Sequence, residues 1–68
     1  MRDTVEEWAQ YRAAVERFTD EELREERDGV REVLRAVERQ PSHLQTGHGV
    51  LVARHRILER EILRRSAF

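Results

Sequence analysis

Histidines are the side chains of this sequence best suited to metal binding or proton transfer. His48 and His55 are seven residues apart, which would place them on one side of a continuous helix, about 10.5 Å apart along its axis. A metal ion needs donor atoms about 2 Å away, so these two cannot share one ion within a chain. His55 and Glu59 have i, i+4 spacing, but two ligands are too few for a metal site. We therefore expect no metal and no other cofactor, and histidines that pack on partly buried faces.

Rows of arginine are the second feature that could carry a function, because every basic residue in the chain is Arg. Cations repeated at helical spacing bind phosphate backbones. Acidic residues interrupt the rows, however, and the net charge is −1, a pattern more typical of a solvated, salt-bridged surface. Nucleic-acid binding is therefore the alternative function. Its phosphate contacts would be Arg27, Arg31, Arg35, Arg56, Arg60 and Arg64.

Residues for covalent catalysis are scarce. The chain has no cysteine and no lysine, and its Ser and Thr residues fall at predicted helix ends or near the termini, where no triad can be proposed. The segment 46–49, Thr-Gly-His-Gly, precedes a predicted helix and could bind an anion there. It lacks the Lys-Ser/Thr of a nucleotide-binding loop and a preceding strand. We expect a protein that is not an enzyme.

The length of 68 residues allows a single domain spanning 1–68. Below roughly 70–80 residues one hydrophobic core rarely supplies more than about 3–5 kcal/mol, and disulfides are excluded here. We therefore expect additional stability to come from self-association or from docking on a partner. No stretch approaches the roughly 20 apolar residues of a membrane span, and the N-terminus lacks the apolar core of a signal peptide. We therefore expect a soluble, cytoplasmic protein.

Charge is unevenly distributed along the chain. Residues 1–40 contain 12 acids and 8 Arg, a balance of −4, whereas residues 41–68 contain 2 acids and 5 Arg, a balance of +3. Opposite charges on the two halves favour a hairpin in which they face each other. The same asymmetry would also stabilise a head-to-tail or antiparallel dimer.

Apolar residues recur at helical spacing in three segments, which predict helices at about 4–17, 20–40 and 50–65. Thr19 and Glu22 form a capping-box pattern, with Phe18 and Leu23 as its hydrophobic staple, so a break is expected at 18–19. Pro41 should end the second helix. The segment 41–49 is predicted as a loop or one short turn, with an alternative helix start at His43.

The third predicted helix has two apolar patches rather than one. Leu51, Leu58 and Ile62 line one face, while Val50, Ala53 and Ile57 lie elsewhere on the circumference. A helix that only covered a hairpin would show one stripe. Two patches indicate two neighbours, which are either both other helices of a three-helix bundle or one helix and a second subunit.

These patterns together predict an all-α protein, either a three-helix unit or a helical hairpin preceded by a shorter helix, that forms oligomers. The preferred function is protein–protein interaction as a regulator, adaptor or assembly factor, with a second copy as partner in a homodimer, or with another protein. Aromatic anchors are common in binding hot spots, and the first helix carries the only Trp and the only Tyr. The predicted contact residues are Trp8, Tyr11, Val50, Ile57, Leu58 and Ile62.

Overall fold

The structure, a computed structural model, describes residues 4–45 and 47–67, and the regular secondary structure in that part of the chain is all helical. Its elements are α1 (Thr4–Arg17), α2 (Asp20–Glu38), a 3-10 turn η1 (Ser42–Leu44) and α3 (His48–Ser66). The described residues contain three α-helices and no strand, which confirms the all-α prediction. None of the described helices is long and apolar enough to cross a membrane.

A capping box separates α1 from α2, as the sequence predicts. The Glu22 backbone N–H donates to the Thr19 hydroxyl over 3.1 Å, and the Thr19 N–H donates to the Glu22 carboxylate over 2.9 Å. Two N–H groups that the helix start would leave unpaired are thereby satisfied. Because Thr19 itself has an extended backbone (φ −67°, ψ 164°), the chain changes direction here.

The second helix ends at Glu38, two residues before the predicted position. Pro41 disfavours a helical conformation for the residue before it. Carbonyl groups at this helix end are capped by the Gln45 side-chain amide. It donates to the carbonyl of Gln40 over 2.8 Å and more weakly to that of Glu38. Between Pro41 and Gln45 the chain forms the single turn η1, which agrees with the predicted short turn and not with a helix starting at His43.

The third helix starts at His48, two residues earlier than predicted, so Gly49 lies inside its first turn. Gly47 precedes it with φ +78°, a left-handed conformation that side chains with a Cβ rarely adopt. Glycine inside a helix costs only about 1 kcal/mol. His48 Nε2 lies 3.1 Å from Glu38 Oε2, and this contact joins the start of α3 to the end of α2.

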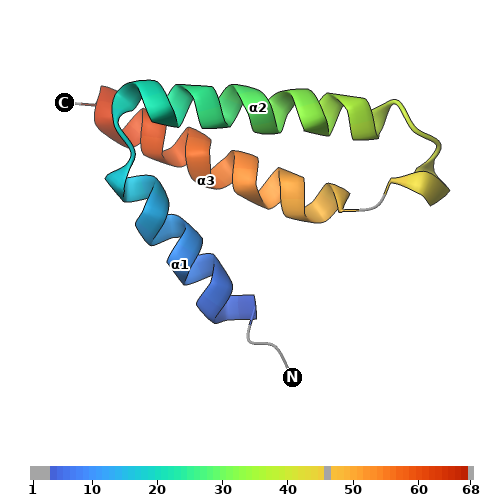
Figure 1. The fold of residues 1–68 in the computed structure, drawn as a ribbon, viewed down its shortest axis with the longest axis horizontal. Coiled ribbons are helices and arrows are strands. Elements are labelled where there is room, and N and C mark those ends of the chain that lie inside the picture. Colours follow the sequence, from blue (N-terminus) through green and yellow to red (C-terminus); the bar gives the residue numbers. More distant parts are fainter. Residues whose placement is uncertain (1–3, 46, 68) are drawn as a thin grey trace.

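Helices α2 and α3 form an antiparallel hairpin, and α1 leaves it at an angle (Figure 1). Helix α3 contacts both of the others, α2 over most of its length and α1 over a shorter part. The buried apolar core draws on all three helices through Val15, Leu23, Val30 and Leu58. Of the two neighbour arrangements predicted for the third helix, the structure therefore contains the one in which both neighbours are helices of the same chain.

The arrangement is more open than a chain of this size requires. Its Cα radius of gyration is 13.2 Å, against about 11 Å for a compact domain of the same length. Its accessible surface is 5494 Å², roughly 1,000 Å² more than expected for a folded monomer of this mass. The shortest dimension is 17 Å, close to a single layer of helices, so a broad part of the α1 and α3 surface has no helix packed on it.

Leu58 should be the most sensitive core position, because its side chain is fully buried between the helices. We expect Leu58→Ala to lower the free energy of unfolding by about 2–5 kcal/mol. Leu63→Ala is the matched control on the same helix, since Leu63 is 68 % exposed, and should change stability by less than about 0.5 kcal/mol. Urea unfolding followed by circular dichroism measures both, and equal effects would contradict the assigned core.

Candidate interaction groove

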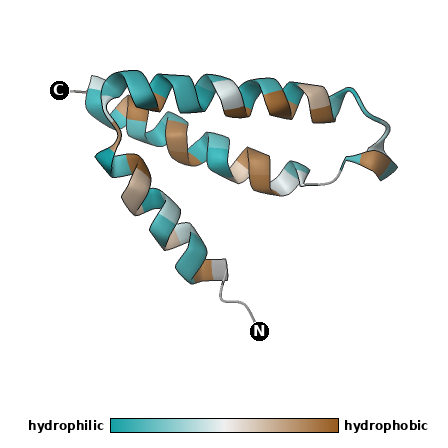
Figure 2. Cartoon of the chain, viewed as in Figure 1, coloured by the Kyte–Doolittle hydropathy of each residue, from teal (hydrophilic) through white to brown (hydrophobic). Residues whose placement is uncertain are grey.

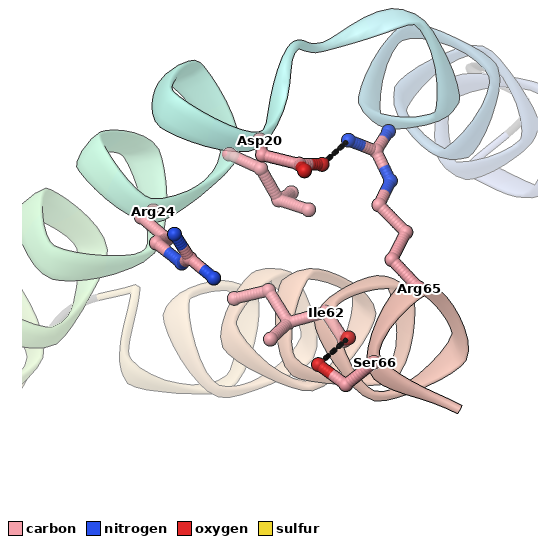
Figure 3. Close-up of a pocket in the computed structure, with 6 residues that line it drawn as sticks. Asp20, Arg24, Ile62, Arg65 and Ser66 are labelled. Atoms are coloured by element: carbon pink, nitrogen blue, oxygen red, sulfur yellow. Dashed lines mark hydrogen bonds and ion pairs between the residues drawn. The ribbon is translucent and has the colours of Figure 1, made fainter. Parts of the chain in front are cut away.

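Arg65, near the end of α3, attaches α1 and α2 to the third helix. Its guanidinium donates to the Asp20 carboxylate in the first turn of α2 over 2.8 Å, a contact visible in Figure 3. It also donates to the backbone carbonyls of Val15 and Glu16 at the end of α1, over 3.5 and 3.3 Å. Carbonyls in the last turn of a helix have no partner within the helix, so one cation caps α1 and fixes its C-terminal end.

Glu61 holds Arg65 in position from within α3. It is a buried acid, 7 % exposed, that accepts from Arg65 Nε over 2.8 Å and from two nitrogens of Arg64. These hydrogen bonds from Arg64 and Arg65 lower the pKa of Glu61 from 4.5 to about 2. The carboxylate is therefore ionised and satisfied although it is buried, as a buried charge must be.

A groove runs between α1 and α3 on the open side of the molecule. Two adjoining hollows form it, and they share Arg12, Arg56 and Ile57. Helix α3 lines it from Gly49 to Arg64, which corresponds to about 22 Å of helix. We call it the α1–α3 groove; it is lined by Trp8, Arg12, Val15, Glu16, Gly49, Val52, Ala53, Arg56, Ile57, Arg60, Glu61 and Arg64.

An aromatic pair on α1 borders this groove. The rings of Trp8 and Tyr11 meet edge to face, with centroids 6.1 Å apart, and the Arg54 guanidinium lies 5.4 Å from the centre of the Tyr11 ring. Burial, and then the nearby negative charge of Glu26, raise the pKa of Tyr11. Both contacts hold the two rings in defined positions.

The residues predicted to contact a partner divide between this groove and the interior. Trp8 and Ile57 line the groove, and Tyr11 and Val50 lie with Trp8 in a neighbouring hollow. Val50 remains 47 % exposed. Leu58 is fully buried, and Ile62 lies between α2 and α3 beside Leu23. The prediction that Leu58 contacts a partner is therefore wrong, because the hairpin itself uses that side chain as core.

The arginine row on α2 is largely occupied by neighbouring acids. Arg27 donates to Asp28 and to Glu59 of α3, each over 2.8 Å, and the hydrogen bond to Glu59 lowers the pKa of that acid. Arg31 reaches the same Glu59 at 3.9 Å. Arg35 is exposed and makes no ion pair within residues 4–45 and 47–67. Most of this row therefore stabilises the hairpin and does not form an open cationic strip.

The arginine row on α3 is different, because it lies along the groove. Arg64 binds Glu61, but Arg56 and Arg60 are exposed and form no ion pair with any described residue. Arg12 of α1 joins them from the opposite wall, also without an ion pair in the described part of the chain. Arg12 was not predicted as a site residue. Its position four residues after Trp8, beside the apolar stripe, is the signal that indicates it.

The histidines take separate positions and do not converge. His48 contacts Glu38 at the end of the hairpin, and His55 is half-buried on α3 close enough to Glu59 to help lower the pKa of that acid. Among the described residues, no group of three or more His, Cys, Asp or Glu is placed to hold a metal ion. Thr46, which begins the segment considered for anion binding, lies outside the described residues.

Comparisons with protein-family models, with curated proteins and with solved structures find no match for this chain.

The buried Glu61 predicts a specific dependence of stability on pH. Because its pKa is about 2 in the folded chain and 4.5 as the ordinary value, the stability it contributes is present above about pH 4.5 and is lost as the pH falls towards 2. Glu61→Gln should therefore cost about 2 kcal/mol at pH 7, and this difference from the parent chain should shrink as the pH falls through that window.

Urea unfolding at pH 7, 4 and 2.5 measures this difference. Glu32→Gln is the control, because Glu32 is exposed on α2 and a substitution there should change stability by less than about 0.5 kcal/mol. A Glu61→Gln penalty that stays constant down to pH 2.5, or that is absent at pH 7, would contradict the role given to this carboxylate.

Proposed function

We propose that this chain is a non-enzymatic helical interaction module that binds another protein through the α1–α3 groove. The bound protein is either a second copy of the chain, giving a homo-oligomer, or a different protein that the module regulates or helps to assemble. The proposal includes a cytoplasmic location.

The openness of the α1–α3 side is the observation that carries the proposal. Helix α1 is fixed to the hairpin at its C-terminal end and diverges towards its N-terminus (Figure 1). The chain exposes roughly 1,000 Å² more than a compact monomer would. One side of a standard protein–protein interface buries about 800 Å². The α1–α3 groove is the continuous hollow on which one such partner could dock.

Nucleic-acid binding is the second candidate, and the exposed Arg12, Arg56 and Arg60 favour it. Other features weigh against it. Arg27 and Arg31 of α2 contact Glu59, and the net charge of the chain is −1. The edge of α2 that faces away from α3 is mostly hydrophilic (Figure 2), and it carries a row of exposed acids that would repel phosphate: Glu21, Glu25, Asp28 and Glu32.

Photo-crosslinking in the cells that make the protein tests the interaction surface. A photo-reactive amino acid in place of Val52, which lines the groove, should capture a protein. The same amino acid in place of Glu25, which is exposed on α2, is the matched control and should capture much less. The mass of the adduct distinguishes a second copy from another protein. No adduct from position 52, or the same adducts from both positions, would contradict the proposal.

Fluorescence anisotropy with labelled random-sequence DNA and RNA duplexes tests the second candidate. At low salt we expect no saturable binding. The nucleic-acid function would be supported instead by binding that weakens steeply with added salt and is lost in Arg56→Glu with Arg60→Glu, or in Arg31→Glu with Arg35→Glu.

A further inference from the structure

The α1–α3 groove combines an apolar floor with a cationic rim. Val15, Ala53 and Ile57 line it together with the Trp8 ring. Its ionisable lining residues are four arginines and two glutamates, a balance of +2. One of those glutamates, Glu61, is buried and already bound by Arg64 and Arg65. The charge presented to an approaching molecule is therefore positive.

From this combination we propose that the occupant of the groove is an acidic amphipathic helix of a partner protein. This inference rests on the proposed function and specifies the partner chemistry. The apolar face of such a helix would cover the Trp8 and Ile57 side of the groove, and its flanking Asp or Glu residues would pair with Arg12, Arg56 and Arg60. A helix fits a groove between two helices, and the lining of α3 corresponds to about four turns of a bound helix.

The distribution of charge argues against a second copy as the occupant. Two copies related by a twofold axis and packed groove to groove would bring two cationic rims together, a repulsive arrangement. The exposed acids of α2 could approach the rim of another copy, but the face of α2 that carries them has no large apolar side chain. Apart from the half-exposed Val33 at its margin, its apolar types are Gly29 and Ala36. Such a surface leaves the apolar floor unfilled.

The apolar floor of the groove also argues against a nucleic acid as its occupant. Phosphates would pair with Arg56 and Arg60, but they offer no apolar side chain to Val52, Ala53 and Ile57. An acidic amphipathic helix satisfies both parts of the groove at once. Charge on its rim then contributes to specificity and association rate, while the apolar contacts contribute most of the affinity.

Trp8 gives a direct probe, because it is the only tryptophan in the chain and lies in the groove. The probe molecule is a synthetic 16-residue amphipathic helical peptide with Leu on one face and Glu on the flanks, without aromatic residues. Its matched peptide has Lys at every Glu position. Titration of the full chain with the Glu peptide should give a saturable blue shift of Trp8 emission, with affinity about tenfold or more above that of the Lys peptide.

Charge reversal then tests the rim. Arg56→Glu with Arg60→Glu should invert the preference, so that the Lys peptide binds more tightly. Arg35→Glu is the control, because Arg35 is an exposed arginine outside the groove with no ion pair in the described part of the chain. This variant should still bind the Glu peptide more tightly than the Lys peptide. Circular dichroism confirms that each variant is as helical as the parent chain.

Four results would overturn the inference: no saturable shift with the Glu peptide, equal affinity for both peptides, a preference that Arg56→Glu with Arg60→Glu leaves unchanged, or displacement of the Glu peptide by an unlabelled oligonucleotide. A shift of Trp8 emission with protein concentration alone, together with a dimer in sedimentation velocity, would also overturn it in favour of a second copy. If position 52 crosslinks to a protein in cells while the Glu peptide fails to bind, the proposed function stands and only the acidic helix is excluded.

Discussion

The structure depends on one cation, Arg65, held by a buried carboxylate. The Arg65 guanidinium donates to the Glu61 carboxylate. It also donates to Asp20 in the first turn of α2 and to the last carbonyls of α1. Loss of Arg65 would leave the buried Glu61 carboxylate with Arg64 as its cation and would remove the side chain of α3 that bonds to the end of α1. All of these contacts lie at one end of the molecule. Helix α1 is therefore anchored at its C-terminal end. The Arg54 guanidinium over the Tyr11 ring adds a contact in its middle, and its first turns extend away from the hairpin (Figure 1).

This one-sided attachment of α1 has consequences for the whole surface. A core of four buried apolar side chains is small for three helices. The hairpin supplies Leu23, Val30 and Leu58, and α1 contributes Val15. The side of α3 that faces α1 is only partly covered, which leaves Val50 half exposed and Trp8 beside an open groove. Arginines without acidic partners collect along the same groove, whereas exposed acids collect on the opposite edge of α2.

The local elements could be predicted from the sequence because their signals are local. Thr19 and Glu22 mark the break between α1 and α2, and Pro41 marks the end of the hairpin arm. The helix ends were predicted only to within two residues. The exact end depends on contacts that the spacing of residues does not reveal, such as the capping of α2 by the Gln45 side chain. The groove was predicted only in part: Trp8 and Ile57 followed from apolar periodicity, but the angle of α1 depends on tertiary contacts such as those of Arg65, which join residues 45 to 50 positions apart. Periodicity places Leu58 and Ile62 on one apolar face of α3 without showing which of them the hairpin encloses fully, so Leu58 could not be assigned to the core from the sequence alone.

Small-angle X-ray scattering tests the central claim, which is that α1 diverges from the hairpin beyond the contacts of its C-terminal half. The measurement is made on dilute protein, where forward scattering reports the mass of a single chain. A splayed chain predicts a radius of gyration near 13.2 Å. A value near 11 Å, as expected for a compact domain of this length, would mean that α1 packs along the hairpin and that the groove is closed, which would contradict the account.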